Sequence, residues 1–107
     1  MSVQLVFKSG ELTALLEGEI DPHTAREVRE EIDSAASQVK PHTLTLDFSG
    51  VQFMDSSGVG LILGRYKLVS MWGGQVCVAN MPEKLEKIVS MAGIRNLCTM
   101  VKDVEEK

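Results

Sequence analysis

The apolar residues of this chain follow two different spacings, and the order in which these spacings alternate constrains the fold more than any other feature. Two-residue spacing and short continuous apolar runs indicate β-strands, whereas spacing of three and four residues indicates amphipathic helices. The chain begins with two strand-like segments, after which helical and strand-like segments alternate. The expected order is β-β-α-β-α-β-α-β, which implies an α/β fold built on a mixed β-sheet.

Local signals fix the expected boundaries of these elements. Ser9 and Gly10 separate the first two strand-like segments and predict an antiparallel hairpin. Asp21 followed by Pro22 is a helix-start signature, because Asp caps helices well and Pro suits the first helical position. The predicted strands are residues 3–7, 12–18, 43–48, 75–79 and 97–101. The predicted helices are residues 22–38, 57–71 and 80–92. Residues 49–52 are predicted to form a loop, and residues 102–107 a charged tail.

Length and charge limit the classes of function. A chain of 107 residues fits one domain, residues 1–107. The net charge of −4 and the absence of a Lys/Arg cluster argue against nucleic-acid binding. Cys77 and Cys98 lie in apolar runs without CxxC spacing, so we expect reduced thiols and a cytoplasmic protein. No apolar run reaches the roughly 20 residues that a membrane helix needs, so we expect no direct membrane insertion.

Residues 53–60, Phe-Met-Asp-Ser-Ser-Gly-Val-Gly, place two hydroxyls and a carboxylate where a strand gives way to a helix. The first backbone N–H groups of a helix have no partner within the helix, so such a turn suits a cap, an anion or a reactive side chain. The structural interpretation is a helix cap at Asp55, Ser56 or Ser57, and it is the more frequent one for four residues taken alone. Gly60 and Gly64 within the following helix predict close packing of that helix on the sheet.

Several kinds of catalytic or ligand-binding site are absent from the sequence. His23 and His42 stand alone, which argues against a metal site. A serine hydrolase needs Gly two residues before its nucleophile, and Met54 occupies that position relative to Ser56. No Gly-Lys-Ser/Thr follows a glycine-rich turn, so there is no P-loop. We therefore expect neither a cofactor nor an enzyme.

Two stretches resemble a known family. Residues 19–25, Glu-Ile-Asp-Pro-His-Thr-Ala, and residues 53–60 with their continuation to Lys67 closely resemble the signature stretches of bacterial anti-sigma factor antagonists, the stand-alone STAS domains. The similarity is greatest to the sporulation type and second to the general-stress type. The resemblance implies a single STAS domain whose helices lie mainly on one face of the sheet. It also implies that Ser56, the first serine of Asp-Ser-Ser-Gly, is the phosphoacceptor.

The resemblance further implies a partner-switching function. In its unphosphorylated form the domain would bind an anti-sigma factor that is also a serine kinase and thereby release a sigma factor. Phosphorylation of Ser56 would end binding, and a serine phosphatase would reset the switch. The expected partner-binding residues lie on both signature stretches and down the following helix, with Asp21 chiefly a cap: Glu19, Asp21, Asp55, Ser57, Gly58, Leu61, Arg65 and Leu68.

Another class of function fits the same resemblance. Some STAS domains are subunits of membrane transport complexes and work without phosphorylation. Neighbouring genes distinguish the two, because kinase and sigma factor genes favour the switch whereas permease genes favour the transport subunit. An enzyme acting on nucleotides has no catalytic constellation in this sequence.

Overall fold

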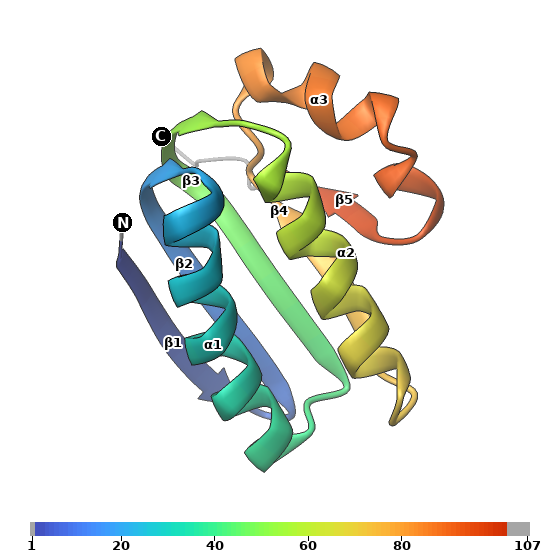
Figure 1. Cartoon of the computed structure of the whole chain (residues 1–107). Coiled ribbons are helices and arrows are strands. Elements are labelled where there is room, and N and C mark those ends of the chain that lie inside the picture. Colours follow the sequence, from blue (N-terminus) through green and yellow to red (C-terminus); the bar gives the residue numbers. More distant parts are fainter. Residues whose placement is uncertain (1, 103–107) are drawn as a thin grey trace, which may run out of the picture.

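A computed structural model describes residues 2–102, in which strands and helices alternate in the predicted order. The elements are β1 (Ser2–Lys8), β2 (Glu11–Ile20), α1 (Pro22–Val39), β3 (Thr43–Met54), α2 (Ser57–Ser70), β4 (Gln75–Ala79), the 3-10 turn η1 (Glu83–Leu85), α3 (Glu86–Met91), the 3-10 turn η2 (Ile94–Asn96) and β5 (Thr99–Val101). Helices α1 and α2 lie side by side on one face of the sheet, while α3 lies near its β5 edge (Figure 1).

The five strands form one mixed sheet, and their order in space follows their order in the chain. Strands β1 and β2 are antiparallel, as the predicted hairpin requires, and each later pair of neighbours is parallel. Parallel neighbours need a crossover, which the intervening helices supply. Every parallel strand therefore ends at the same edge of the sheet, and α1 and α2 both begin at that edge (Figure 1).

The core lies between the sheet and the two long helices. Leu12, Leu44 and Val76 are register neighbours on three adjacent strands, and all are buried. From α1, the buried side chains of Val28 and Ile32 pack onto this layer. Buried and less buried residues alternate along β2 and the first half of β3, so one face of the sheet covers the core.

Strand β3 is longer than predicted, and residues 49–52 are strand and not loop. The pairing with β2 shifts register twice, between Leu15 and Glu17 and again between Gly18 and Glu19, so β3 carries an extra residue at each shift. Such bulges interrupt the two-residue alternation that identifies a strand in a sequence. A Cβ atom at Gly50 would lie 2.9 Å from the Leu16 carbonyl oxygen, which explains the glycine beside the first bulge.

The third helical segment also differs from the prediction. Pro82 precedes the turn η1, and α3 itself covers six residues, so a helix over residues 80–92 was too long. The last strand is likewise shorter than predicted and begins at Thr99. The predicted tail lies outside the described residues from position 103 onward.

Candidate functional site

Ser56 lies at the surface, at the first turn of α2. Its backbone is helical, with φ −65° and ψ −13°, and its carbonyl oxygen accepts hydrogen bonds from the N–H groups of Val59 and Gly60 at 3.1 and 3.3 Å. The Ser56 side chain is exposed and makes no capping hydrogen bond. The Ser56 hydroxyl is therefore presented at the start of a helix and is accessible to a partner.

Asp55, and not Ser56, supplies the side-chain acceptor at the start of α2. Its Oδ1 atom accepts the Ser57 backbone N–H at 2.8 Å and also contacts the Ser57 hydroxyl. A carboxylate at a helix N-terminus is favoured by the helix dipole as well as by the unpaired N–H groups. The two serines are thus different, since the Ser57 hydroxyl is engaged within the turn whereas that of Ser56 points to solvent.

The two signature stretches meet at the carboxyl edge of the sheet. Glu19 pairs with Phe53 and Ile20 with Met54 in the parallel register of β2 and β3. The Asp55 N–H then donates to the Ile20 carbonyl oxygen at 3.2 Å. This pairing places Glu19 and Asp21 beside the Ser56 turn, although they are more than thirty positions away in the chain.

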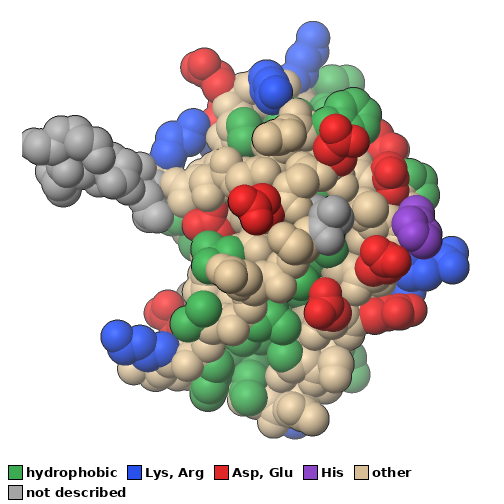
Figure 2. Space-filling view, turned by 90° about the vertical axis from the view of Figure 1, so that its left-hand side faces the viewer, with side chains coloured by type: hydrophobic (Ala, Val, Ile, Leu, Met, Phe, Trp, Pro, Cys, Tyr) green, Lys and Arg blue, Asp and Glu red, His purple; other side chains and the backbone are tan. Residues whose placement is uncertain are grey.

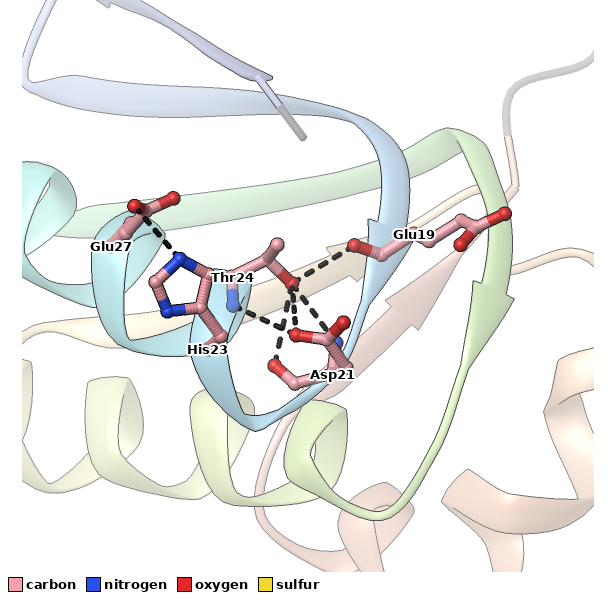
Figure 3. A network of polar contacts seen from close by, with 5 residues as sticks. All are labelled: Glu19, Asp21, His23, Thr24 and Glu27. Atoms are coloured by element: carbon pink, nitrogen blue, oxygen red, sulfur yellow. Dashed lines mark hydrogen bonds and ion pairs between the residues drawn. The ribbon is translucent and has the colours of Figure 1, made fainter.

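The predicted cap at Asp21 is a complete capping box. Asp21 Oδ1 accepts the Thr24 N–H at 2.9 Å, and Thr24 Oγ1 accepts the Asp21 N–H at 2.9 Å (Figure 3). The Thr24 hydroxyl also lies 2.9 Å from the carbonyl oxygen of Glu19 and donates to it. The hydrogen bond from the Thr24 backbone holds the pKa of Asp21 below its ordinary value. Asp21 is committed to α1, whereas the exposed carboxylate of Glu19 points away from the cap (Figure 3).

The expected contact surface along α2 is wrong for two of its three residues. Leu61 is 3% exposed and Arg65 is 5% exposed, while Leu68 is half-buried against the core. The reason is that α2 packs against α1 as well as against the sheet, so apolar residues on two of its sides are covered. Any docking surface around Ser56 must therefore come from neighbouring elements and from the first turn of α2.

Arg65 joins the two long helices through Asp33 of α1, a partner that the sequence analysis did not identify. Arg65 Nε lies 2.7 Å from Asp33 Oδ1, and Nη2 donates to Oδ2 at 3.2 Å. The Nε contact is an ion pair without hydrogen-bond alignment, so the directional bonds come from Nη2 and from Nη1, which donates to the Leu61 carbonyl oxygen at 3.1 Å. Burial lowers the pKa of Arg65, and the charge of Asp33 opposes this effect.

The glycines of α2 also need a correction. At Gly60 and Gly64, which we expected to pack closely on the sheet, no atom lies within 4 Å of the position that a Cβ atom would occupy. Close packing instead occurs at Gly58, which is buried against Met54. The four-residue spacing of Gly60 and Gly64 therefore does not report a packed helix face.

Phe53 is a surface residue that the sequence analysis left without a role. Its side chain is 51% exposed, and it directly precedes the buried Met54 at the end of β3. Exposed aromatic side chains are frequent anchors of protein interfaces. The irregular pairing that precedes Phe53 hid this orientation, because simple alternation over residues 48–53 does not assign its face.

The described residues bring together no group of three or more metal-ligating side chains. Within the same part of the chain, no helix is both long enough and apolar enough to cross a membrane.

Anti-sigma factor antagonists are among the known proteins to which this chain is similar. The STAS domain model matches residues 2–107. The anti-sigma F factor antagonist of Paenibacillus polymyxa is 35% identical over 94 residues, which cover 88% of this chain and 80% of that protein. The structure of the anti-sigma factor antagonist SpoIIAA in its unphosphorylated form superposes with a TM-score of 0.83 at 30% identity, covering 97% of this chain and 90% of that one.

A second solved structure is that of the Bacillus cell fate determinant SpoIIAA in its phosphorylated form, with a TM-score of 0.76 at 30% identity over 97% of this chain and 93% of that one. These relatives confirm the similarity to sporulation-type anti-sigma factor antagonists that the two signature stretches predicted. The observed sheet and helices likewise confirm the predicted α/β fold. This chain belongs to the STAS domain family.

Proposed function

We propose that this protein is an anti-sigma factor antagonist that is controlled by phosphorylation of Ser56. In the unphosphorylated form it binds an anti-sigma factor that is also a serine kinase, and this binding releases a sigma factor. Support comes from the anti-sigma F factor antagonist that is 35% identical and from the SpoIIAA structure at 30% identity. The domain acts as a substrate and docking module, and the proposal includes no catalytic activity of its own.

The observation that carries the proposal is the difference between the two serines of the turn. The Ser57 hydroxyl contacts the Asp55 carboxylate, whereas the exposed Ser56 side chain makes no capping hydrogen bond. A kinase needs an accessible hydroxyl, and transfer to Ser56 would disturb no hydrogen bond that holds the turn. Ser56 is therefore the phosphoacceptor in this proposal.

Phosphorylation changes charge much more than shape. It adds about −1.5 to −2 charges at pH 7. The dipole of α2 favours this dianion at the first turn of the helix, but the neighbouring Asp55 carboxylate makes the patch strongly negative. The fold then persists while the partner is repelled, in keeping with the fact that unphosphorylated and phosphorylated SpoIIAA both share this fold.

A phosphate on Ser56 can supply the free energy that is needed to reverse the binding preference. Reversing a 99:1 preference takes about 5.5 kcal/mol. Burying an unpaired charge at an interface costs several kcal/mol per ion. A phosphate that enters the contact with the partner without a cation can therefore switch binding off, and a serine phosphatase restores it.

The proposal places the switch in the cytoplasm and gives it no nucleic-acid partner. Cys98 is buried and forms no disulfide within residues 2–102, a state typical of a reducing compartment. The net charge of −4 opposes binding to a polyanion.

Incubation of the protein with its anti-sigma factor kinase and ATP tests the proposal, with the modified residue mapped by mass spectrometry. We expect phosphate on Ser56 of the wild type and of Ser57→Ala, and none on Ser56→Ala. Phosphate on Ser57, or no phosphate with an active kinase, would overturn the assignment.

Binding measurements complete the test. Unphosphorylated Ser56→Ala should bind the anti-sigma factor about as well as the wild type, because the hydroxyl makes no capping hydrogen bond. Ser56→Asp should bind more weakly, because it introduces one negative charge beside Asp55. Equal affinity of these two variants would mean that charge at Ser56 does not control binding.

A further inference from the structure

An open hollow of about 370 Å³ lies between the N-terminal halves of α1 and α2, directly beside the Ser56 turn. Arg26 and Arg29 of α1 contribute to one wall. The other wall belongs to α2, where Ser57 and Gly60 lie near the turn and the largely buried Arg65 lies deeper along the helix. Gly60 keeps this wall open, because no side chain fills the space over it.

The hollow carries an excess of positive charge. Both Arg26 and Arg29 are exposed, and within residues 2–102 neither of them forms an ion pair. Asp33 compensates Arg65, so Arg26 and Arg29 are the uncompensated charges among the three arginines that line the hollow. The charge of Arg29 also contributes to the lowered pKa of Arg65, which places it within electrostatic range of the buried guanidinium.

The charges of α1 are separated by face. Glu27, Glu30 and Glu31 line a different depression, which α1 shares with Leu5 of β1. Figure 2 shows acidic side chains gathered on the α1 side of the molecule as seen from the β1 edge. The arginines instead face the groove toward α2, where both helices begin and their dipoles add positive potential.

We propose that this hollow binds a carboxylate side chain of the anti-sigma factor kinase and thereby anchors the kinase beside Ser56, an inference that rests on the proposed function. Arginine suits this task because its planar guanidinium group binds a carboxylate through two parallel hydrogen bonds. Two unpaired arginines on one rim can clasp an Asp or Glu side chain without losing an existing partner. The contact would also explain how an acidic protein presents an attractive surface at its switch.

The same hollow sharpens the effect of phosphorylation. A phosphate on Ser56 lies one residue from the Ser57 wall and brings about two negative charges to the edge of the hollow. The partner's carboxylate then meets a dianion in place of a basic rim. The phosphate offsets the attraction of the arginines and also repels the partner's carboxylate. One modification therefore weakens the contact in two ways.

Binding of the unphosphorylated protein to the kinase at low and at high salt tests the inference. The variant Arg26→Gln/Arg29→Gln removes both rim charges, and Arg26→Lys/Arg29→Lys keeps the charges but removes the planar groups. The control Lys8→Gln/Lys67→Gln removes two positive charges from exposed positions at the far end of β1 and in the last turn of α2. Thermal unfolding of each variant checks that the fold is retained.

We expect the glutamine variant to bind about tenfold more weakly at low salt and to lose most of the salt dependence of the wild type. The lysine variant should lie between the two, and the control should match the wild type. Unchanged affinity and salt dependence in the glutamine variant would overturn the inference while leaving the proposed function intact. A wild type that neither binds the kinase nor is phosphorylated by it would overturn both.

Titration of inorganic phosphate into the free protein tests the other possible occupant of the hollow, a phosphate ion. If phosphate binds at the arginines and the kinase affinity does not depend on them, the hollow is a phosphate site and the inference is wrong. If phosphate only weakens kinase binding through the same arginines, it acts as a competitor and the inference stands.

Discussion

Gly58 lies against the side chain of Met54, which fills the space that a Cβ atom at position 58 would occupy. Met54 ends β3 and is 2% exposed, while Gly58 is a buried residue in the first turn of α2. The strand and the helix therefore approach each other directly across Asp55 and Ser56. This contact sets how tightly the turn is folded and how the Ser56 hydroxyl is presented.

Gly58→Ala should destabilise the protein by about 1–3 kcal/mol, because the new methyl group forces the packed Met54 side chain to move. Gly60→Ala is the matched control, since its methyl group meets no atom within 4 Å. Alanine has the higher helix propensity, so this change should stabilise the protein by about 0.5–1 kcal/mol. Urea unfolding measures both, and a stabilising effect of Gly58→Ala would mean that Met54 can yield without cost.

Asp55→Ala should destabilise the protein by about 1 kcal/mol, because it removes the acceptor of the Ser57 N–H. Ser56→Ala should change the free energy of unfolding far less, since the Ser56 side chain makes no capping hydrogen bond. Chemical denaturation of the two variants beside the wild type checks the order. If Ser56→Ala lowered the free energy of unfolding more than Asp55→Ala does, Ser56 would be the helix cap and the structural interpretation of the turn would be favoured.

The fold was predictable from the sequence wherever periodicity was regular. Asp21 and Pro22 begin α1 as expected, because their capping chemistry is local. Strand β3 was cut short in the prediction because its pairing with β2 shifts register twice, and a bulge removes the alternation on which the prediction rests. The predicted strand was therefore too short at the point where pairing with a distant strand, and not local sequence preference, decides the structure.

The position of the site was predictable from the sequence, but the set of exposed residues around it was less so. The Asp55-Ser56-Ser57 turn lies where the sequence placed it, beside the end of β2. Leu61 and Arg65 were expected to bind the partner, which requires that they be exposed. The packing of α2 against α1 buries them, and this contact includes the ion pair of Arg65 with Asp33, which is distant in sequence and had no signal of its own.

Asp33→Ala should destabilise the protein more than Arg65→Met does. The Arg65 side chain is 6% exposed and that of Asp33 is 33% exposed, so loss of the carboxylate leaves a buried cation without compensation. Loss of a partner from a buried ion pair costs about 3–5 kcal/mol, and Asp33→Ala should approach the lower end of that range. Arg65→Met keeps the apolar stem, and the remaining carboxylate can turn to water. Urea unfolding of both variants provides the comparison, and the reverse order would contradict this account of the pair.

The capping box of α1 predicts a specific dependence on pH. The pKa of Asp21 lies below its ordinary value of 3.8, chiefly because the Thr24 backbone N–H donates to its carboxylate. A carboxylate whose pKa is lowered by folding stabilises the protein above its unfolded-state pKa, and this contribution is lost as the pH falls through the folded-state pKa. Asp21→Asn is the sharpest comparison, because asparagine keeps a capping oxygen and removes only the charge.

The wild type should therefore be more stable than Asp21→Asn at neutral pH, and the difference should shrink once the pH falls below 3.8. Asp21→Ala, which removes the oxygen as well, should be the least stable of the three at every pH. Urea unfolding of the three proteins across this range measures the differences. A gap between wild type and Asp21→Asn that stays constant through the acid range would show that the charge of Asp21 contributes nothing to the start of α1.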